Sequence, residues 1–346
     1  MNLQHRLIPR WALAVAVVSM VVAPAPARAV TIDWVTVGDP NNTADDTGYG
    51  AVADAFRIGK YEVTIQQYTD FLNAVAATDP YSLYNTNMAS DLNIAGIARH
   101  GTNGGYSYSV INNDGLGGNR PITYVSWFDA ARFANWMCNG QGADSTETGA
   151  YTLGDGPMGA KNPGAQFYIP TEDQWYKAAY YKRGGTNAGY WDYATQSDTA
   201  PGNTIGSGAN QANYNNGVFA VTQSSSFSLS NGYLTDVGAF SSSVSAYGTF
   251  DQNGNVWEWN NLTDAAGSDR GLRGGNWGSF ASVLSSSCRY TDVHWLEGSD
   301  IGFRLASPVR ASVPEIDPAG MGSVLALVTG ALGLFERRRL KAKLAA

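Results

Sequence analysis

The chain has 346 residues and a formal net charge of −7 at pH 7, with 29 acidic residues against 22 lysines and arginines. Eight of those basic residues lie in the two end segments, residues 1–29 and 313–346, so the long middle region is strongly acidic and carries no basic cluster. This distribution excludes nucleic acid and anionic membrane surfaces as partners of the middle region, and it is compatible with cation binding.

The first segment, residues 1–29, has the layout of a secretory signal peptide. Basic residues precede an apolar stretch, and the small-residue sequence Ala27-Arg28-Ala29 follows it, as signal peptidase sites require. We expect cleavage before Val30. The alternative is a buried N-terminal helix, which is disfavoured because Pro24 and Pro26 would end a helix directly after the apolar stretch.

The last segment, residues 313–346, contains Val313-Pro314-Glu315, an apolar stretch over residues 320–335, and a terminal cluster of arginines and lysines. Basic residues stay on the cytoplasmic side of a membrane, and the apolar stretch is shorter than the roughly 20 residues that cross a bilayer comfortably. The arrangement resembles the PEP-CTERM sorting signal, although Ile316 stands where that signal has proline. The resemblance implies transient membrane insertion, an exosortase as partner, and transfer to the cell envelope or extracellular matrix.

Between the two ends, three capping boxes predict the start of helices. In a capping box, a hydroxyl and the side chain three residues later each accept a hydrogen bond from the other residue's backbone N–H. Apolar residues at helical spacing follow the first box up to Ala76, and Asn139-Gly140 is expected to end the second helix. The boxes are Thr64 with Gln67, Ser126 with Asp129, and Thr171 with Gln174.

The rest of the middle region alternates short extended runs with long loops. No internal repeat or low-complexity linker divides it. We therefore expect a single α+β domain over residues 30–312, with few helices, short sheets and much ordered loop. The expected strands are residues 56–63, 166–169 and 302–306, and the expected loops are residues 144–165 and 184–231.

Six short motifs are spread over roughly residues 55–307. They are Ile58–Thr64, Pro121–Trp127 with Asp129-Ala130, Ile169–Glu172 with Trp175, Gly254–Trp259, Arg273–Trp277 and Ile301–Arg304. Their order and spacing resemble the formylglycine-generating enzyme (sulfatase-modifying factor) family. The resemblance implies a fold related to the C-type lectin fold, in which a few helices and short sheets support a large fraction of ordered loop.

The motif tryptophans are expected in the core. A buried tryptophan removes a large apolar area from water while its indole N–H donates to a carbonyl. A role as a binding platform is the alternative for any one of them, and core packing is the interpretation that we prefer. These residues are Trp127, Trp175, Trp257, Trp259 and Trp277.

The motif glycines and arginines are expected to shape and brace loops. Gly254, Gly274 and Gly275 are expected where the backbone takes positive φ or approaches another segment closely. Arginine side chains hold loops by donating to buried carboxylates or carbonyls. We expect this bracing role for Arg273, Arg289 and Arg304.

The resemblance also locates the catalytic positions of the family. Its catalytic members oxidise a substrate cysteine with molecular oxygen and a copper ion that two cysteine thiolates hold. Here the two positions carry Ser279 and Leu284. A hydroxyl is a hard ligand and leucine has no donor atom, whereas Cu(I) prefers soft thiolates, so we expect neither copper binding nor oxidase activity.

Two cysteines remain, Cys138 in the second expected helix and Cys288 near the C-terminal motifs. Some family members have a structural disulfide between these segments, at positions that align with Ala134 and Ser286. The resemblance therefore implies a Cys138–Cys288 disulfide in the oxidising compartment of an exported protein. Two buried free thiols are the alternative.

The resemblance further implies two structural calcium sites built from oxygen ligands, which Ca²⁺ prefers. The alternative for both sites is that their Asp and Asn side chains only form turns. The second site has lost charge, because Asn231 falls where the family has an acid. The first site comprises Asp251, Gly254, Val256 and Glu258, and the second comprises Asn213, Tyr214, Asn231 and Tyr233.

Three functions are compatible with these features. The first is an exported, calcium-stabilised binding or display domain for cell-surface or matrix polysaccharide or protein. The second is an active oxidase or hydroxylase of the sulfatase-modifying factor type that converts a substrate cysteine to formylglycine. The third is a purely structural matrix component. The residues at the copper positions favour a protein that is not an enzyme.

Overall fold

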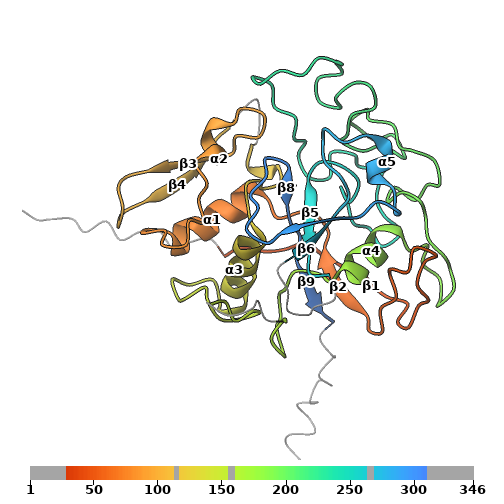
Figure 1. Ribbon diagram of the computed structural model, residues 1–346, viewed down its shortest axis with the longest axis horizontal. Coiled ribbons are helices and arrows are strands. Elements are labelled where there is room, and N and C mark those ends of the chain that lie inside the picture. Colours follow the sequence, from red (N-terminus) through yellow and green to blue (C-terminus); the bar gives the residue numbers. More distant parts are fainter. Residues whose placement is uncertain (1–28, 113–116, 155–159, 263–268, 310–346) are drawn as a thin grey trace, which may run out of the picture.

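The computed structural model describes residues 29–112, 117–154, 160–262 and 269–309. Residues 1–28 and 310–346 are not among them, so the expected signal peptide and sorting segment lie outside the described residues. Within these ranges, short helices and short strands are joined by long ordered loops (Figure 1), which confirms the α+β class. The described part of the chain forms no helix with the length and apolarity that a bilayer crossing requires.

The three predicted capping boxes are confirmed at helices α1 (Ile65–Val75), α3 (Trp127–Cys138) and α4 (Glu172–Tyr180). At the start of α1, Thr64 Oγ1 accepts from the Gln67 N–H at 3.3 Å, and Gln67 Oε1 accepts from the Thr64 N–H at 2.8 Å. The other two helices repeat this arrangement. The sequence therefore predicts the N-cap residue of each of these three helices correctly.

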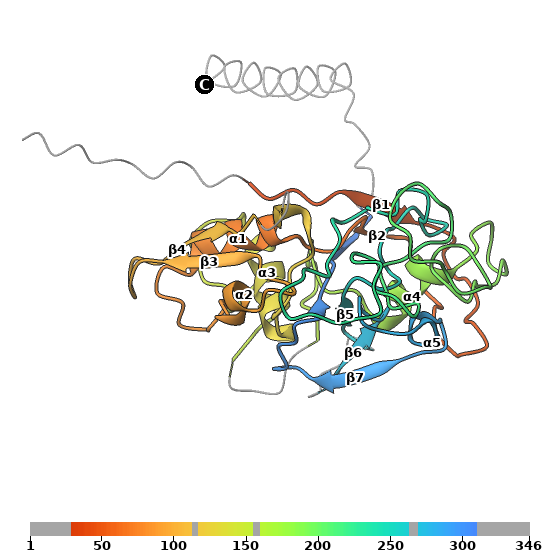
Figure 2. The same ribbon diagram turned by 90° about the horizontal axis from the view of Figure 1, so that it is seen from above.

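One antiparallel sheet contains β1 (Trp34–Val37), β2 (Phe56–Gly59) and β9 (Ala306–Pro308), with β2 in the centre. A second sheet has the order β7-β6-β5-β8 and comprises β5 (Trp257–Asn260), β6 (Asp269–Arg273), β7 (Tyr290–Val293) and β8 (Ile301–Gly302). Strands β5 and β8 run parallel, whereas the other pairs of this sheet are antiparallel. Figure 2 shows β1 and β7 at opposite surfaces of the molecule.

Three strand predictions need correction. The strand expected over residues 302–306 is divided into the end of β8 and the start of β9, because the carbonyls of Phe303 and Leu305 accept instead from Val63 and Gly59. The strand expected over residues 166–169 is reduced to one bridge, between Tyr168 and Ala306. The strand expected over residues 56–63 is shorter than predicted, since β2 ends at Gly59.

The remaining elements are short. Helix α2 (Asn87–Ser90) precedes a hairpin of β3 (Ile97–His100) and β4 (Ser107–Val110) that extends from the body in Figure 1. The 3-10 helix η1 (Gly117–Asn119) lies beside α1, and α5 (Ala281–Leu284) follows the loop after β6. Among the described residues of the two expected loop regions there is no helix or strand.

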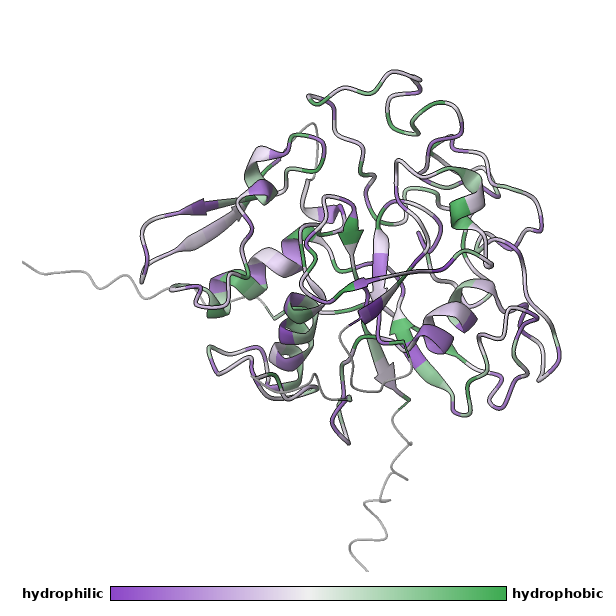
Figure 3. Ribbon diagram, viewed as in Figure 1, coloured by the Kyte–Doolittle hydropathy of each residue, from purple (hydrophilic) through white to green (hydrophobic). Residues whose placement is uncertain are grey.

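The largest apolar core lies between the buried faces of α1 and α3. Figure 3 shows both helices with mixed apolar and polar sides, as expected for helices that cover a core. Trp127, Trp175 and Trp259 are fully buried, which confirms the expected core role for these three residues. Trp257 and Trp277 are only partly buried, so their rings remain in part accessible.

Candidate functional site

The two positions that the family resemblance assigns to the copper ligands, Ser279 and Leu284, lie in the loop and short helix after β6. Ser279 Oγ accepts from the Asn276 N–H at 3.1 Å and donates to Asn276 Oδ1 at 2.9 Å. Leu284 is fully buried in an apolar cluster with Ala212 and Tyr214. One position therefore stabilises a turn, and the other fills a hydrophobic core.

The motif glycines adopt the predicted backbone conformations. Gly254, Gly274 and Gly275 have φ values of 81°, 96° and 73°. A Cβ atom added at Gly254 would lie 2.0 Å from the backbone oxygen of Asn213. Any side chain at position 254 would therefore separate two backbone segments that are in contact.

Arg304 is the centre of a buried charge cluster. Its Nε donates to Glu258 Oε2 at 2.5 Å and its Nη2 donates to Glu258 Oε1 at 2.6 Å. The same guanidinium donates to the carbonyls of Gly59 at 3.0 Å and Phe250 at 2.8 Å. Because Arg304 is fully buried, it braces three separate segments at once, which confirms its predicted role.

Two further carboxylates lie in this cluster. Glu62 Oε2 is 3.8 Å from Arg304 Nη2, and Glu62 Oε1 accepts from Asn255 Nδ2 at 3.2 Å. Burial, together with the nearby Asp251 charge, raises the pKa of Glu62 well above its ordinary value. Burial likewise raises the pKa of Asp251 to about 6. Three carboxylates share one guanidinium, so the cluster has an excess of acid.

A second ion-pair cluster, centred on the buried carboxylate of Glu172, confirms the role predicted for Arg273 and Arg289. Arg273 Nε donates to Glu172 Oε1 at 2.8 Å, and Arg273 Nη1 donates to the carbonyls of Ser286 and Cys288. Arg289 Nε donates to the same carboxylate at 2.9 Å. These bonds fasten the loop after α5 to the start of α4.

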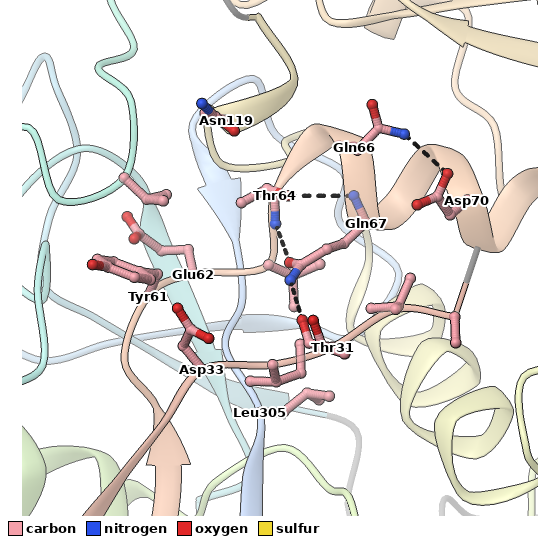
Figure 4. Close-up of a pocket in the computed structure, with 15 residues that line it drawn as sticks. Thr31, Asp33, Tyr61, Glu62, Thr64, Gln66, Gln67, Asp70, Asn119 and Leu305 are labelled. Atoms are coloured by element: carbon pink, nitrogen blue, oxygen red, sulfur yellow. Dashed lines mark hydrogen bonds between the residues drawn. The ribbon is translucent and has the colours of Figure 1, made fainter.

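A cavity of about 340 Å³ lies beside the start of α1 (Figure 4). The chain segment after Ala29, the Tyr61–Thr64 turn, α1 and the end of η1 form its walls. Polar groups at the cavity come from Asp33, Tyr61, Glu62 and Asn119, together with Gln66 and Asp70 on α1. No pattern in the sequence predicted this cavity, although Tyr61 and Glu62 belong to a motif that precedes a capped helix.

The family model described as the sulfatase-modifying factor enzyme 1-like domain matches residues 28–309. The chain belongs to this family. The fold is accordingly the C-type-lectin-like one of this family, an α+β fold with few helices, short sheets and much loop, as the motifs implied. No curated protein matches the chain.

Three solved structures are similar to this family member at low sequence identity. Treponema denticola variable protein 1 is 19% identical, covers 82% of this chain and 98% of its own, and has a TM-score of 0.48. CarF is 22% identical, covers 81% of this chain and 99% of its own, and has a TM-score of 0.48. PvdO from Pseudomonas aeruginosa is 17% identical, covers 80% of this chain and 92% of its own, and has a TM-score of 0.42.

Both carboxylates of the first expected calcium site have hydrogen-bond partners within the chain. Both oxygens of Glu258 accept from Arg304, and Trp175 Nε1 also donates to Oε2 at 2.8 Å. Asp251 Oδ2 accepts from the Gly238 N–H at 2.6 Å. The guanidinium therefore supplies the positive charge that Ca²⁺ would bring to Glu258. The carbonyls of Gly254 and Val256 add no further charged ligand.

The second expected site is bridged by amide groups. Asn213 Nδ2 donates to the Tyr233 carbonyl at 2.9 Å, so two expected ligand groups contact each other directly. The Tyr214 carbonyl accepts from Asn203 Nδ2 at 3.2 Å, and Asn231 is exposed. Among the described residues, no three His, Cys, Asp or Glu side chains form a group able to hold a metal ion. Calcium binding stays a prediction that chelation and thermal unfolding would test.

The structure corrects the expected disulfide, because Cys138 and Cys288 are both free thiols. Cys138 Sγ donates to the Phe167 carbonyl at 3.4 Å, whereas the Cys288 carbonyl accepts from Arg273. Cys138 lies one helical turn from the aligned position, which is a shift of about 5.4 Å along the helix. That shift is nearly the whole Cα–Cα distance that a disulfide spans, about 5.5–6 Å.

Proposed function

We propose that this protein is a binding or display domain that lacks the oxidase activity of the catalytic family members. The supporting observation is what the side chains at positions 279 and 284 contact. The Ser279 hydroxyl is engaged in a turn with Asn276, and the Leu284 side chain is fully buried among apolar residues. The scaffold of the family is kept, and its two sulfur ligands are replaced.

The chemistry of copper makes this replacement decisive. Cu(I) prefers thiolate or thioether ligands, and a serine hydroxyl is a hard oxygen donor. Cys288 is the one cysteine of the C-terminal motif region, and burial raises the pKa of its thiol, which disfavours the thiolate that a metal requires. A single, partly buried thiol cannot supply the two-sulfur site.

The proposal includes export and sorting. The two end segments predict secretion, exosortase processing, and retention in the cell envelope or extracellular matrix. In that setting the ligand is a matrix or surface polysaccharide, or a surface protein. The strongly acidic middle region disfavours polyanionic ligands.

The test is aldehyde formation on a cysteine-containing peptide by the purified protein, with copper and oxygen supplied. A catalytic member of the family serves as the positive control under the same conditions. We expect no aldehyde and no oxygen consumption above the rate without protein. Catalytic turnover of the peptide by this protein would refute the proposal and establish the alternative, an active oxidase of the sulfatase-modifying factor type.

A further inference from the structure

We propose that the cavity beside α1 binds an amino-sugar unit of a glycan, with the sugar ammonium directed to its carboxylates. This inference rests on the binding function proposed above and names the ligand class. The cavity volume of about 340 Å³ falls at the lower end of the range of small-molecule sites, roughly 300–1,000 Å³. The site is separate from the positions of Ser279 and Leu284, which do not line it.

The charge of the lining selects a cationic group. Asp33 and Asp70 line the cavity as carboxylates, Glu62 lines it as a buried acid with a raised pKa, and no lysine or arginine lines it. Within the described residues, no hydrogen-bond or ion-pair partner is present for the exposed Asp33 carboxylate. Carboxylates attract an ammonium group and repel sulfate, phosphate and uronic acid groups.

Glu62 gives an independent indication. The residue is 2% exposed, and its Oε2 has no hydrogen-bond partner. Its ion-pair partner is Arg304 Nη2 at 3.8 Å, and the hydrogen bonds of that nitrogen go to Glu258 and the Phe250 carbonyl. A buried acceptor without a donor is costly, and a ligand donor in the cavity would relieve that cost.

The uncharged polar groups that line the cavity can form hydrogen bonds with the hydroxyl groups of a sugar. The Asn119 amide and the Tyr61 hydroxyl make no hydrogen bond with any other described residue, and both line the cavity. An amide and a phenol can each donate to and accept from sugar hydroxyls. Apolar side chains complete the lining and can contact the C–H groups of a sugar ring. They are Val30, Ile32, Val63, Val237 and Leu305.

Hydrogen bonds within the protein hold the walls of the cavity in place without a ligand. Gln67 closes the capping box of α1, and its Nε2 donates to the Thr31 carbonyl at 2.8 Å (Figure 4). On the other side of Thr31, the Val30 N–H donates to Gln141 Oε1 at 2.6 Å. The chain segment that forms one wall is therefore held against the body. A preformed site loses less conformational entropy on binding.

The experiment is calorimetric titration of the purified protein with three ligands at low ionic strength. These are a glucosamine hexasaccharide, its fully N-acetylated form, and spermidine. The acetylated hexasaccharide has the same skeleton without the ammonium, and spermidine has ammonium groups without the sugar. We expect binding of the glucosamine hexasaccharide that is at least tenfold tighter than binding of either control.

Two variants locate the binding. Asp33→Asn removes one charge from an exposed carboxylate and is expected to weaken hexasaccharide binding about tenfold. Asn119→Ala is expected to weaken it less, because the lost hydrogen bond is uncharged. Asp46→Asn is the matched control, since Asp46 is also exposed and does not line the cavity. We expect this control to bind as the wild type does.

Several results would overturn the assignment. They are no binding of the glucosamine hexasaccharide, equal binding of the acetylated form or of spermidine, or equal losses in Asp33→Asn and Asp46→Asn. Each would leave the absence of oxidase activity as a separate result, because that assay uses a different ligand and a different part of the molecule. Conversely, aldehyde formation would refute the proposed function whatever the glycan result.

Discussion

The molecule has two deeply buried regions, and different interactions stabilise them. One is the helical region, where α1 and α3 pack together, and the other is formed by the loops around Arg304. Between the helices, Phe71 packs edge-to-face against Phe133 with ring centroids 5.4 Å apart, in a continuous apolar core. Around Arg304, the buried groups are carboxylates, a guanidinium and backbone carbonyls. The helical region depends on apolar burial, whereas the braced loops depend on satisfied polar contacts.

The difference follows from the geometry of loops. Helices satisfy their own backbone groups and need only an apolar face to pack. Buried loops leave carbonyls such as those of Gly59 and Phe250 without regular partners, so side chains must supply donors. A substitution in the loops should therefore do harm by leaving charges unpaired, and one in the helices by leaving a cavity.

Arg304→Met is expected to have the largest effect. It leaves Glu258 and Glu62 buried without a cation, and breaking a buried ion pair costs roughly 3–5 kcal/mol. Urea unfolding would measure the loss of unfolding free energy. Arg289→Met is the matched control, because Arg289 donates to Glu172 but its side chain is 36% exposed, and a loss of about 1 kcal/mol is expected. Equal losses would contradict the account.

Phe71→Ala tests the helical region. Removing a fully buried ring should cost about 3 kcal/mol through lost burial and a residual cavity. The same urea experiment applies, with Phe280→Ala as the control, since Phe280 is 64% exposed. A change within about 0.5 kcal/mol is expected for that control. A mild effect of Phe71→Ala would show that the apolar core is not what stabilises this region.

The pH dependence of stability tests the contribution of Asp129, a buried carboxyl group on α3. Burial raises the pKa of Asp129 to about 7, with Glu297 also raising it and Ser126 and Arg132 lowering it. The folded state therefore takes up a proton below pH 7 that the unfolded state takes up only near pH 4. This group makes unfolding free energy rise as pH falls from 7 to 4, by up to about 1.4 kcal/mol per pH unit.

Asp129→Asn removes that proton uptake and keeps a side-chain oxygen for the Ser126 N–H. Unfolding free energies at pH 5, 6, 7 and 8 should therefore depend less steeply on pH in the variant than in the wild type. Parallel curves for the two proteins would show that Asp129 has an ordinary pKa in the folded state.

Thr64→Ala is expected to have the smallest effect of the set. It removes one half of the capping box of α1, which costs about 1 kcal/mol. Thr64→Ser keeps the hydroxyl and should retain most of the stability. The comparison would fail if both variants lost the same free energy, because the loss would then come from the methyl group rather than the cap.

The sequence predicted what local chemistry determines. Each capping box involves residues three apart, so Thr64, Ser126 and Thr171 mark their helices without tertiary information. The positive φ of Gly254 and Gly275 and the bracing by Arg304 were likewise predictable from the motifs. The family resemblance supplied the overall arrangement.

Long-range pairing was not predictable in the same way. The sequence indicates that Arg304 needs a carboxylate, but only the fold selects Glu258, 46 residues earlier. The disulfide prediction was wrong because a shift of one helical turn moved Cys138 toward the Phe167 carbonyl. The cavity joins Asp33, Glu62 and Asn119 from three distant segments, and no spacing rule connects them.

The most direct test of the central claim is the binding of Cu(I), measured by competition with a chromogenic chelator under reducing conditions. With Ser279 and Leu284 at the two ligand positions, the protein is expected to leave the chelator complex intact at equimolar concentration. A catalytic family member should remove the metal in the same experiment. Stoichiometric transfer of Cu(I) to this protein would contradict the account.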